Sequence, residues 1–240
     1  MKKIFKSYSQ LSLFLISSIF ILFSPLQKDY LKLIFVLFFH ELGHIFFLSL
    51  YKIKIDSFKI SILGGFIETK IDLKLYQELL IYSGGIIFNI ILLAFPLLSK
   101  YSLFIIIFNI LPIYPLDGYN ILKSILAYFI SYNKAIYISY LLSIFIVIIL
   151  IILSIIYLNA FLLINLIYCL ILTIINYNNR TIEYNRFLLN KYRNYKKRKY
   201  IYLYKMNKYP FYKYHNTIIW NNGIIVTDKD LLEKKFFDRR

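Results

Sequence analysis

Two histidines and a glutamate interrupt a strongly apolar stretch, FVLFFHELGHIFFLSLY, at residues 35–51. His40 and His44 are four positions apart, so on a helix both imidazoles lie on one face, where both can bind one Zn²⁺ at about 2.0–2.1 Å. Glu41 lies about 100° further round that helix and can reach a water molecule at the metal without being a ligand. Such a glutamate can act as general base and then general acid in peptide hydrolysis. Ionisable groups in apolar sequence are costly and usually functional.

A catalytic zinc usually has three protein ligands, so a third is needed. The remaining histidine, His215, lies in the basic tail and is predicted to be an ordinary surface residue. Asp117 follows two prolines in NILPIYPLDGYN, residues 109–120, where the turn can direct its carboxylate at the metal; it can also simply cap the next helix. The alternative is a membrane zincin of the CAAX-processing or heat-shock type, with a glutamate ligand. Its candidates are Glu68, Glu78 and Glu183.

The elements that must position these residues are membrane helices. The chain has 240 residues, of which 60% are hydrophobic, with long Ile, Leu and Phe runs. This composition predicts an all-α polytopic membrane protein. We expect about six spans, at 11–26, 30–51, 76–98, 101–130, 136–157 and 159–177. The single cysteine, Cys169, lies in an apolar run, so it is expected to be a core or lipid-facing residue.

Charge gives the expected orientation. Of the net charge of +17, the last 61 residues, 180–240, contribute +11, with 16 Lys/Arg against 5 Asp/Glu. Basic segments remain cytoplasmic, so an even span number places both the N-terminus and the C-terminus in the cytoplasm. The KYRNYKKRKYIYLYK segment is expected to bind anionic lipids. Nucleic acid, the alternative partner for interleaved Lys and Tyr, is disfavoured.

Two segments depart from a plain helical pattern. Residues 53–71 alternate apolar and polar residues around a Gly-Gly, which predicts a small β-hairpin at the membrane surface after the second span. This hairpin could offer a strand edge to a peptide, or could be a plain connector.

The domains expected are a transmembrane metalloprotease domain at 1–178, with its core at 30–130, and a basic cytoplasmic tail at 179–240. NTIIWNNGIIVTDKDLLEKKFFDRR in the tail predicts strand, Asn-Gly turn, strand and a helix capped by Thr227 with Asp230.

Together these motifs resemble the site-2 protease family of intramembrane zinc metalloproteases. HELGH at 40–44 matches the first family motif, and NILPIYPLDG at 109–118 matches the second. SGGIIFN at 83–89 is similar to a Gly-Pro-x-x-Asn element, with Ile86 in place of the proline, and LGG at 63–65 to a Gly-Gly element. The resemblance implies one zinc bound by His40, His44 and Asp117, with Glu41 as the catalytic residue. It implies substrate or oxyanion positioning by Asn109 and Asn89, although Asn109 could instead be a helix-packing amide.

Within the family, RFLLNKY at 186–192 and the six-span plan resemble the stage IV sporulation protein FB branch. This resemblance implies a membrane-associated substrate, a pro-sigma or anti-sigma factor, membrane inhibitory partners, and location in the membrane around the forespore. Relatives with this tail carry a nucleotide-sensing CBS domain. The tail here is long enough only for a truncated CBS-like fragment, which puts ATP sensing in doubt. The alternative of another class is a non-proteolytic membrane metal transporter or scaffold.

Overall fold

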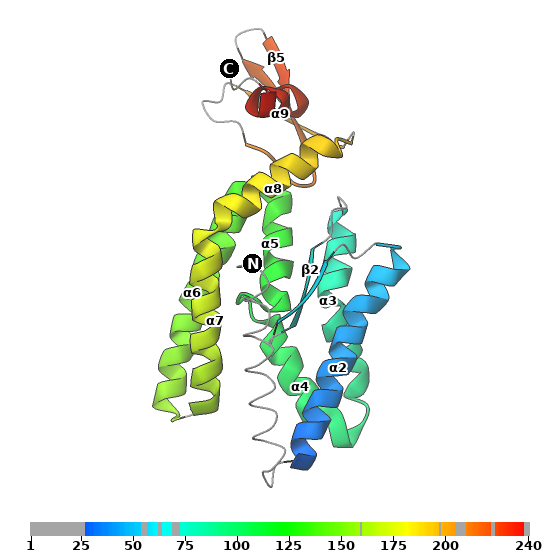
Figure 1. The fold of residues 1–240 in the computed structure, drawn as a ribbon, viewed down its shortest axis with the longest axis vertical. Helices are drawn as coiled ribbons and strands as arrows, with labels where there is room; N and C mark the ends of the chain where they lie inside the picture. Colours follow the sequence, from blue (N-terminus) through cyan, green and yellow to red (C-terminus); the bar gives the residue numbers. More distant parts are fainter. Residues whose placement is uncertain are drawn as a thin grey trace, which may run out of the picture. The chain divides into compact units, whose positions relative to one another are not determined.

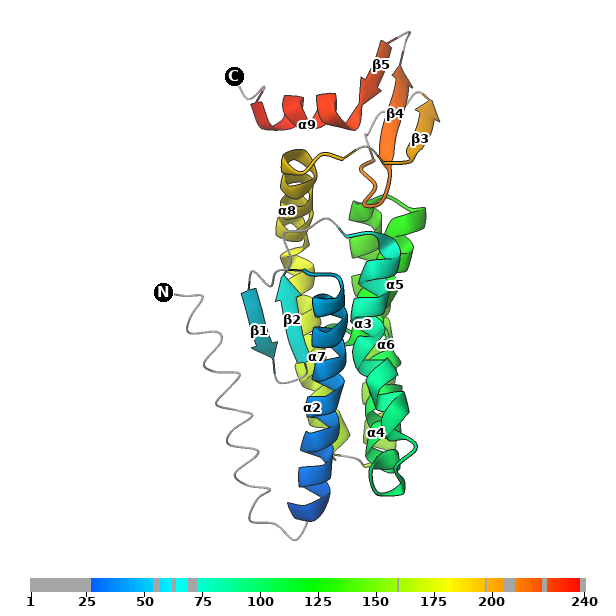
Figure 2. The same ribbon diagram turned by 90° about the vertical axis from the view of Figure 1, so that its right-hand side faces the viewer.

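The computed structural model describes residues 27–53, 57–61, 64–68, 73–158, 160–196, 198–204, 210–221 and 224–237. The span predicted at 11–26 lies outside these residues. The described chain is mostly helical and has two small sheets (Figures 1 and 2). It divides into two compact units. The first takes in 1–71, 77–111 and 115–118, and the second takes in 72–76, 112–114 and 119–240.

The first unit contains the HELGH segment, which lies within one long helix as its spacing predicts. Its elements are α2 (Gln27–Leu50), β1 (Ser57–Ser61), β2 (Gly64–Glu68), most of α3 (Leu75–Leu92) and α4 (Pro96–Ile110). Helices α2 and α4 pack against each other, and Val36, Leu92 and Ile105 form a small buried core. Strands β1 and β2 pair antiparallel, with Ser57 opposite Glu68. The β-hairpin predicted within 53–71 is therefore present.

The boundary between the third and fourth predicted spans was placed too late in the sequence. Helix α3 ends at Leu92, and α4 already begins at Pro96, whereas the spans were predicted as 76–98 and 101–130. Proline is well suited to the first turn of a helix because its missing N–H would have no partner there. Apolar residues continue through this break, so hydropathy alone could not locate it.

The fourth predicted span is broken, as its prolines indicate. Helix α4 ends at Ile110, and α5 (Asp117–Phe129) begins after six intervening residues. Within the second unit, the backbone N–H of Tyr114 donates to Ser143 Oγ at 2.8 Å, and Thr173 Oγ1 donates to the Tyr114 carbonyl at 3.3 Å. Irregular backbone inside a membrane needs such partners. Two polar side chains on apolar helices thus stabilise the broken segment.

The second unit is a helical group followed by a small mixed domain. Its further elements are α6 (Tyr132–Ile156), α7 (Ala160–Asn178), α8 (Arg180–Arg193), β3 (Tyr200–Tyr204), β4 (Asn216–Asn221), β5 (Ile224–Thr227) and α9 (Asp228–Phe237). Helices α6 and α7 pack along each other. Tyr119, Ile136 and Tyr140 belong to a buried cluster in this unit. Cys169 is fully buried, as expected for a core residue.

The tail is a folded β3-β4-β5 sheet with α9. Strands β3 and β4 are parallel, and β4 and β5 are antiparallel, so the strand–strand–helix prediction for the end of the chain is confirmed. The predicted cap is also present, since Thr227 Oγ1 donates to Asp230 Oδ2 at 2.7 Å and the Asp230 N–H points back to Thr227 Oγ1 at 3.4 Å. The turn residues between β4 and β5 lie outside the described part of the chain.

Two residues of the tail differ from expectation because this domain has its own core. His215, predicted to be a surface residue, is 8% exposed and lies edge-on to the Tyr128 ring. Lys191, within the predicted lipid-binding segment, is 4% exposed. Its ammonium donates to Asp228 Oδ2 at 2.5 Å and also to two backbone carbonyls. Lys191 is therefore a buried structural cation and is not available to lipid.

Three helices of the described chain are long and apolar enough to cross a membrane: Leu31–Leu50 within α2, α3, and α6. The number rises to four if α7 and α8, which meet at a bend of 57°, count as one broken span. Helix α4 is apolar but shorter. The prediction of a polytopic membrane protein agrees with this result. The count of six spans stays a prediction.

Candidate metal centre

The centre begins where α2 and α3 cross at glycines. A Cβ on Gly84 would lie 2.6 Å from the Gly43 carbonyl oxygen, and a Cβ on Gly43 would collide with the Gly84 carbonyl. Real Cβ atoms do not come this close, so both positions require glycine for the two backbones to approach. The crossing lies within the HELGH segment, which brings α3 directly against both histidines.

His44 is held by the backbone of α3. Its Nδ1 lies 2.7 Å from the Ile81 carbonyl oxygen, and the side chain is buried. A carbonyl can only accept a hydrogen bond, so Nδ1 must carry the proton. In the neutral ring, Nε2 then has a free lone pair. This is the tautomer needed for a metal ligand whose second nitrogen is held by a carbonyl.

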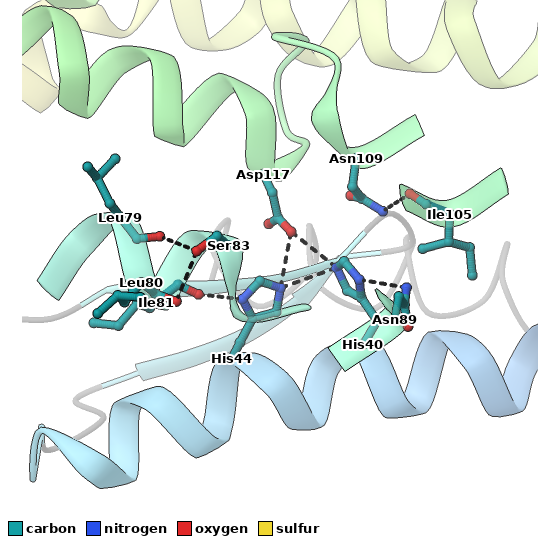
Figure 3. A network of polar contacts seen from close by, with 10 residues as sticks. All are labelled: His40, His44, Leu79, Leu80, Ile81, Ser83, Asn89, Ile105, Asn109 and Asp117. Carbon is teal, nitrogen blue, oxygen red and sulfur yellow. Dashed lines mark hydrogen bonds and ion pairs between the residues drawn. The ribbon is translucent and has the colours of Figure 1, made fainter. Parts of the chain in front are cut away.

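His40 occupies space left by another glycine of α3. A Cβ on Gly85 would lie far inside van der Waals contact of the His40 ring, 2.6 Å from its Cδ2 atom and closer still to Cε1 and Nε2. The ring is 3% exposed, and its Nδ1 lies 3.1 Å from Asn89 Nδ2. Figure 3 shows Asn89 on the side of the His40 ring away from Asp117. The amide predicted to position substrate is therefore in contact with a histidine ring.

Asp117 is brought to the histidines by the turn before α5. It is the first residue of that helix, and a Cβ on the next residue, Gly118, would lie 2.5 Å from the Leu111 carbonyl oxygen. The start of α5 therefore packs closely on the end of α4. The Asp117 Oδ2 atom lies 3.1 Å from His40 Nε2 and 3.3 Å from His44 Nε2 (Figure 3).

The three atoms form a nearly equilateral triangle, since the two Nε2 atoms are 3.2 Å apart. Ligands at about 2.0–2.1 Å from a tetrahedral Zn²⁺ are separated by roughly 3.3–3.4 Å, so the triangle has the size of one face of such a site. Asp117 Oδ2 is buried and has no hydrogen-bond partner apart from its ion-pair contacts with the two Nε2 atoms. One carboxylate and two imidazoles whose Nε2 atoms converge on one point fit a divalent cation with a fourth position open. Among the described residues, this is the group of His, Cys, Asp and Glu side chains that can hold a metal ion.

The other predicted site residues lie around this triangle. Glu41 is partly exposed on α2, and its carboxylate interacts electrostatically with His44. Asn109 is 8% exposed, and its Nδ2 donates to the Ile105 carbonyl one turn earlier in α4, at 3.1 Å. Figure 3 draws this contact between the Asn109 amide and the Ile105 carbonyl. Its amide hydrogen bond corresponds to the helix-packing alternative.

The proposed glutamate ligands have other surroundings in the described chain. Glu183 lies in the second unit, where it accepts a hydrogen bond from Lys123 at 2.9 Å. Glu78 is buried near the start of α3 and does not belong to the group of three. The side chain of Glu68 lies outside the described residues. Sequence reasoning missed the Ile81 carbonyl and Gly84, although adjacent glycines inside an apolar helix indicate a close backbone approach.

Comparison with solved structures finds a chain of similar fold, a site-2 protease from Methanocaldococcus jannaschii. The TM-score is 0.55 and the sequence identity is 23%, covering 71% of this chain and 87% of that chain. No protein-family model matches this chain, and no curated protein matches it. The similarity agrees with the fold expected from the sequence motifs. It gives no support to a particular closeness to the sporulation branch.

Proposed function

We propose that this protein is an intramembrane zinc endopeptidase that hydrolyses a peptide bond in a membrane-associated protein. The observation that carries the proposal is the triangle of His40 Nε2, His44 Nε2 and Asp117 Oδ2, with edges of 3.1–3.3 Å. Similarity in fold to a site-2 protease supports the same function, since that protein is named for proteolysis.

The proposed roles follow from the chemistry of each side chain. His40, His44 and Asp117 hold the zinc, and their single negative charge leaves a site of net charge +1, which costs less in a low-dielectric bundle than a His₃ site. When bound, zinc acts as a Lewis acid that activates water and polarises the scissile carbonyl. Glu41 takes a proton from the attacking water as its oxygen bonds to the carbonyl carbon. Glu41 then gives that proton to the leaving amine as the C–N bond breaks.

For the substrate, we propose a regulatory protein with a segment in or on the membrane. A pro-sigma factor is the first candidate and an anti-sigma factor the second, on the resemblance of the sequence motifs to those of sporulation proteases. The paired strands β1 and β2 offer outer edges at which an extended substrate could add a strand. Asn109 would lie within reach of the substrate near Asp117.

The test is co-expression with tagged pro-sigma and anti-sigma candidates, comparing the wild-type chain with Glu41→Gln. The proposal expects zinc at one ion per chain in both proteins, and cleavage with the wild type alone, because the amide preserves shape but cannot accept the proton. Asp117→Ala should lose both zinc and cleavage. Transmembrane metal flux that survives Glu41→Gln would instead identify a transporter. Full zinc content and cleavage in Asp117→Ala would select a glutamate as the third ligand.

A further inference from the structure

We infer that Asn89 is a positioning residue that fixes the tautomer and orientation of His40 when the metal site is loaded. The inference rests on the proposed function, since it concerns how one zinc ligand is held. Asn89 is fully buried, lies on α3, and contacts the outer nitrogen of the His40 ring. It touches the ring and not the triangle, so it would act through His40.

The two histidines of the centre are held in matching ways. His44 presents Nε2 to the triangle and has its Nδ1 against the Ile81 carbonyl. His40 also presents Nε2 to the triangle, and its Nδ1 faces the Asn89 carboxamide at 3.1 Å. For both rings to give a lone pair at Nε2, both Nδ1 atoms must carry a proton. His44 has its acceptor in the backbone, whereas His40 depends on a side chain.

The Asn89 carboxamide contains the acceptor that His40 needs. In the structure, Asn89 Nδ2 faces His40 Nδ1, while Asn89 Oδ1 is buried without a hydrogen-bond partner. Two N–H groups cannot hydrogen-bond to each other, so this orientation suits a His40 ring protonated on Nε2, which donates to Asp117. Exchange of the amide oxygen and nitrogen places Oδ1 at Nδ1. The Nδ1 proton then has an acceptor, and Nε2 is free to bind a metal.

The amide orientation therefore separates two states of the site. With Oδ1 toward the ring, His40 is a zinc ligand; with Nδ2 toward the ring, His40 is a hydrogen-bond donor to Asp117. The role also explains why an amide lies fully buried in an apolar helix. A partner held to the outer nitrogen of a zinc histidine typically contributes about 10–100-fold in metal affinity.

The experiment measures zinc affinity of the full-length protein in detergent by competition with a chromophoric chelator, with the cobalt(II) absorption spectrum as a second reading. Asn89→Leu keeps the shape of the side chain and removes the acceptor, so zinc affinity should fall about 10–100-fold and the cobalt bands should change. Asn89→Asp supplies a carboxylate acceptor and should restore tight binding and the wild-type spectrum. The matched control is Asn176→Leu, which removes a partly buried amide that donates to the Leu172 carbonyl in α7 and should leave affinity unchanged.

Wild-type affinity and spectrum in Asn89→Leu would overturn the inference while leaving the zinc site intact. Equal loss in Asn89→Leu and Asn89→Asp, with both proteins folded by circular dichroism, would also overturn it, because a packing role alone would then account for the effect. Failure of the wild-type protein to bind zinc would instead overturn the proposed function. These outcomes are distinguished by the same titration.

Discussion

Replacement of Gly85 by alanine tests whether the approach of α3 to α2 sets the geometry of the centre. The new methyl group would occupy the space of the His40 imidazole, with its Cβ 2.6 Å from the ring Cδ2 atom. Ordinary carbon contacts begin near 3.4 Å, so the ring must retreat by at least about 0.8 Å at Cδ2, and by more at Cε1 and Nε2, which lie closer to the new methyl group. The methyl group is fixed to the α3 backbone, so either the His40 ring must rotate away or one of the two helices must move.

This displacement is large compared with the tolerance of a zinc site. Ligand distances in such sites hold to about ±0.2 Å, so a retreat of about 0.8 Å removes His40 from coordination. We therefore expect Gly85→Ala to lose at least about 100-fold in zinc affinity, as much as the largest losses on removing a histidine's outer partner. The overpacking itself should cost about 1–3 kcal/mol of stability, which leaves the fold intact in a well-stabilised protein.

The assay is metal content after purification, together with chelator competition, for Gly85→Ala and for Ser83→Ala as its neighbour on α3. Ser83 Oγ donates to the Leu79 carbonyl of its own helix at 2.7 Å, so its loss should leave zinc binding unchanged. Zinc bound by Gly85→Ala at wild-type stoichiometry and affinity would refute the reasoning. It would mean that His40 is not confined by α3, and that the glycine serves another purpose.

Three further changes have expected outcomes. Gly118→Ala should push the start of α5, and with it Asp117, away from the end of α4. The variant should therefore lose bound zinc, as measured by metal analysis. Lys191→Met leaves the buried Asp228 carboxylate without its cation and should cost the tail about 3–5 kcal/mol in urea unfolding followed by Trp220 fluorescence, with partial recovery when Asp228→Asn is added. Burial lowers the pKa of His215 from 6.5, so the unfolded tail binds more protons than the folded tail below about pH 6.5. The free energy of unfolding should therefore fall as pH drops through that value, by at most about 1.4 kcal/mol per pH unit. The same titration on His215→Phe should lack this component.

The chemical residues could be predicted from sequence because their spacing is tied to the helix period. His40 and His44 lie one turn apart, and the only geometry in which both reach one ion is the helix that the apolar run already predicts. Asp117 could be predicted because it is an acidic residue beside prolines in an apolar segment, where an uncompensated charge is expensive. Local sequence therefore contained both halves of the centre. It did not contain the distance between them.

That distance depends on backbone contacts between segments far apart in the chain. Gly43 meets Gly84, and Gly118 meets the end of α4, and neither contact has a periodic pattern in the sequence. The break at Pro96 was placed several residues late for a similar reason, because Leu and Ile continue through it. Strands β4 and β5 and helix α9 of the tail were predicted, whereas β3 and the burial of Lys191 and His215 were not. Its 16 Lys/Arg residues indicated a segment that binds anionic lipid, whereas Lys191 is enclosed by carbonyls and Asp228.

The contacts that set the site also explain why a cation belongs in it. Once glycines bring the helices together, the Ile81 carbonyl requires a proton on the outer nitrogen of His44, so in the neutral ring a lone pair faces Asp117 Oδ2 at 3.3 Å. An anionic oxygen and an imidazole lone pair at that distance repel each other unless a proton or a metal lies between them. Without a metal, that gap needs a second proton on the ring, which makes His44 an imidazolium. A divalent cation bound at this point would remove the repulsion between the carboxylate and the imidazole lone pairs, and it would do so for all three ligands at once.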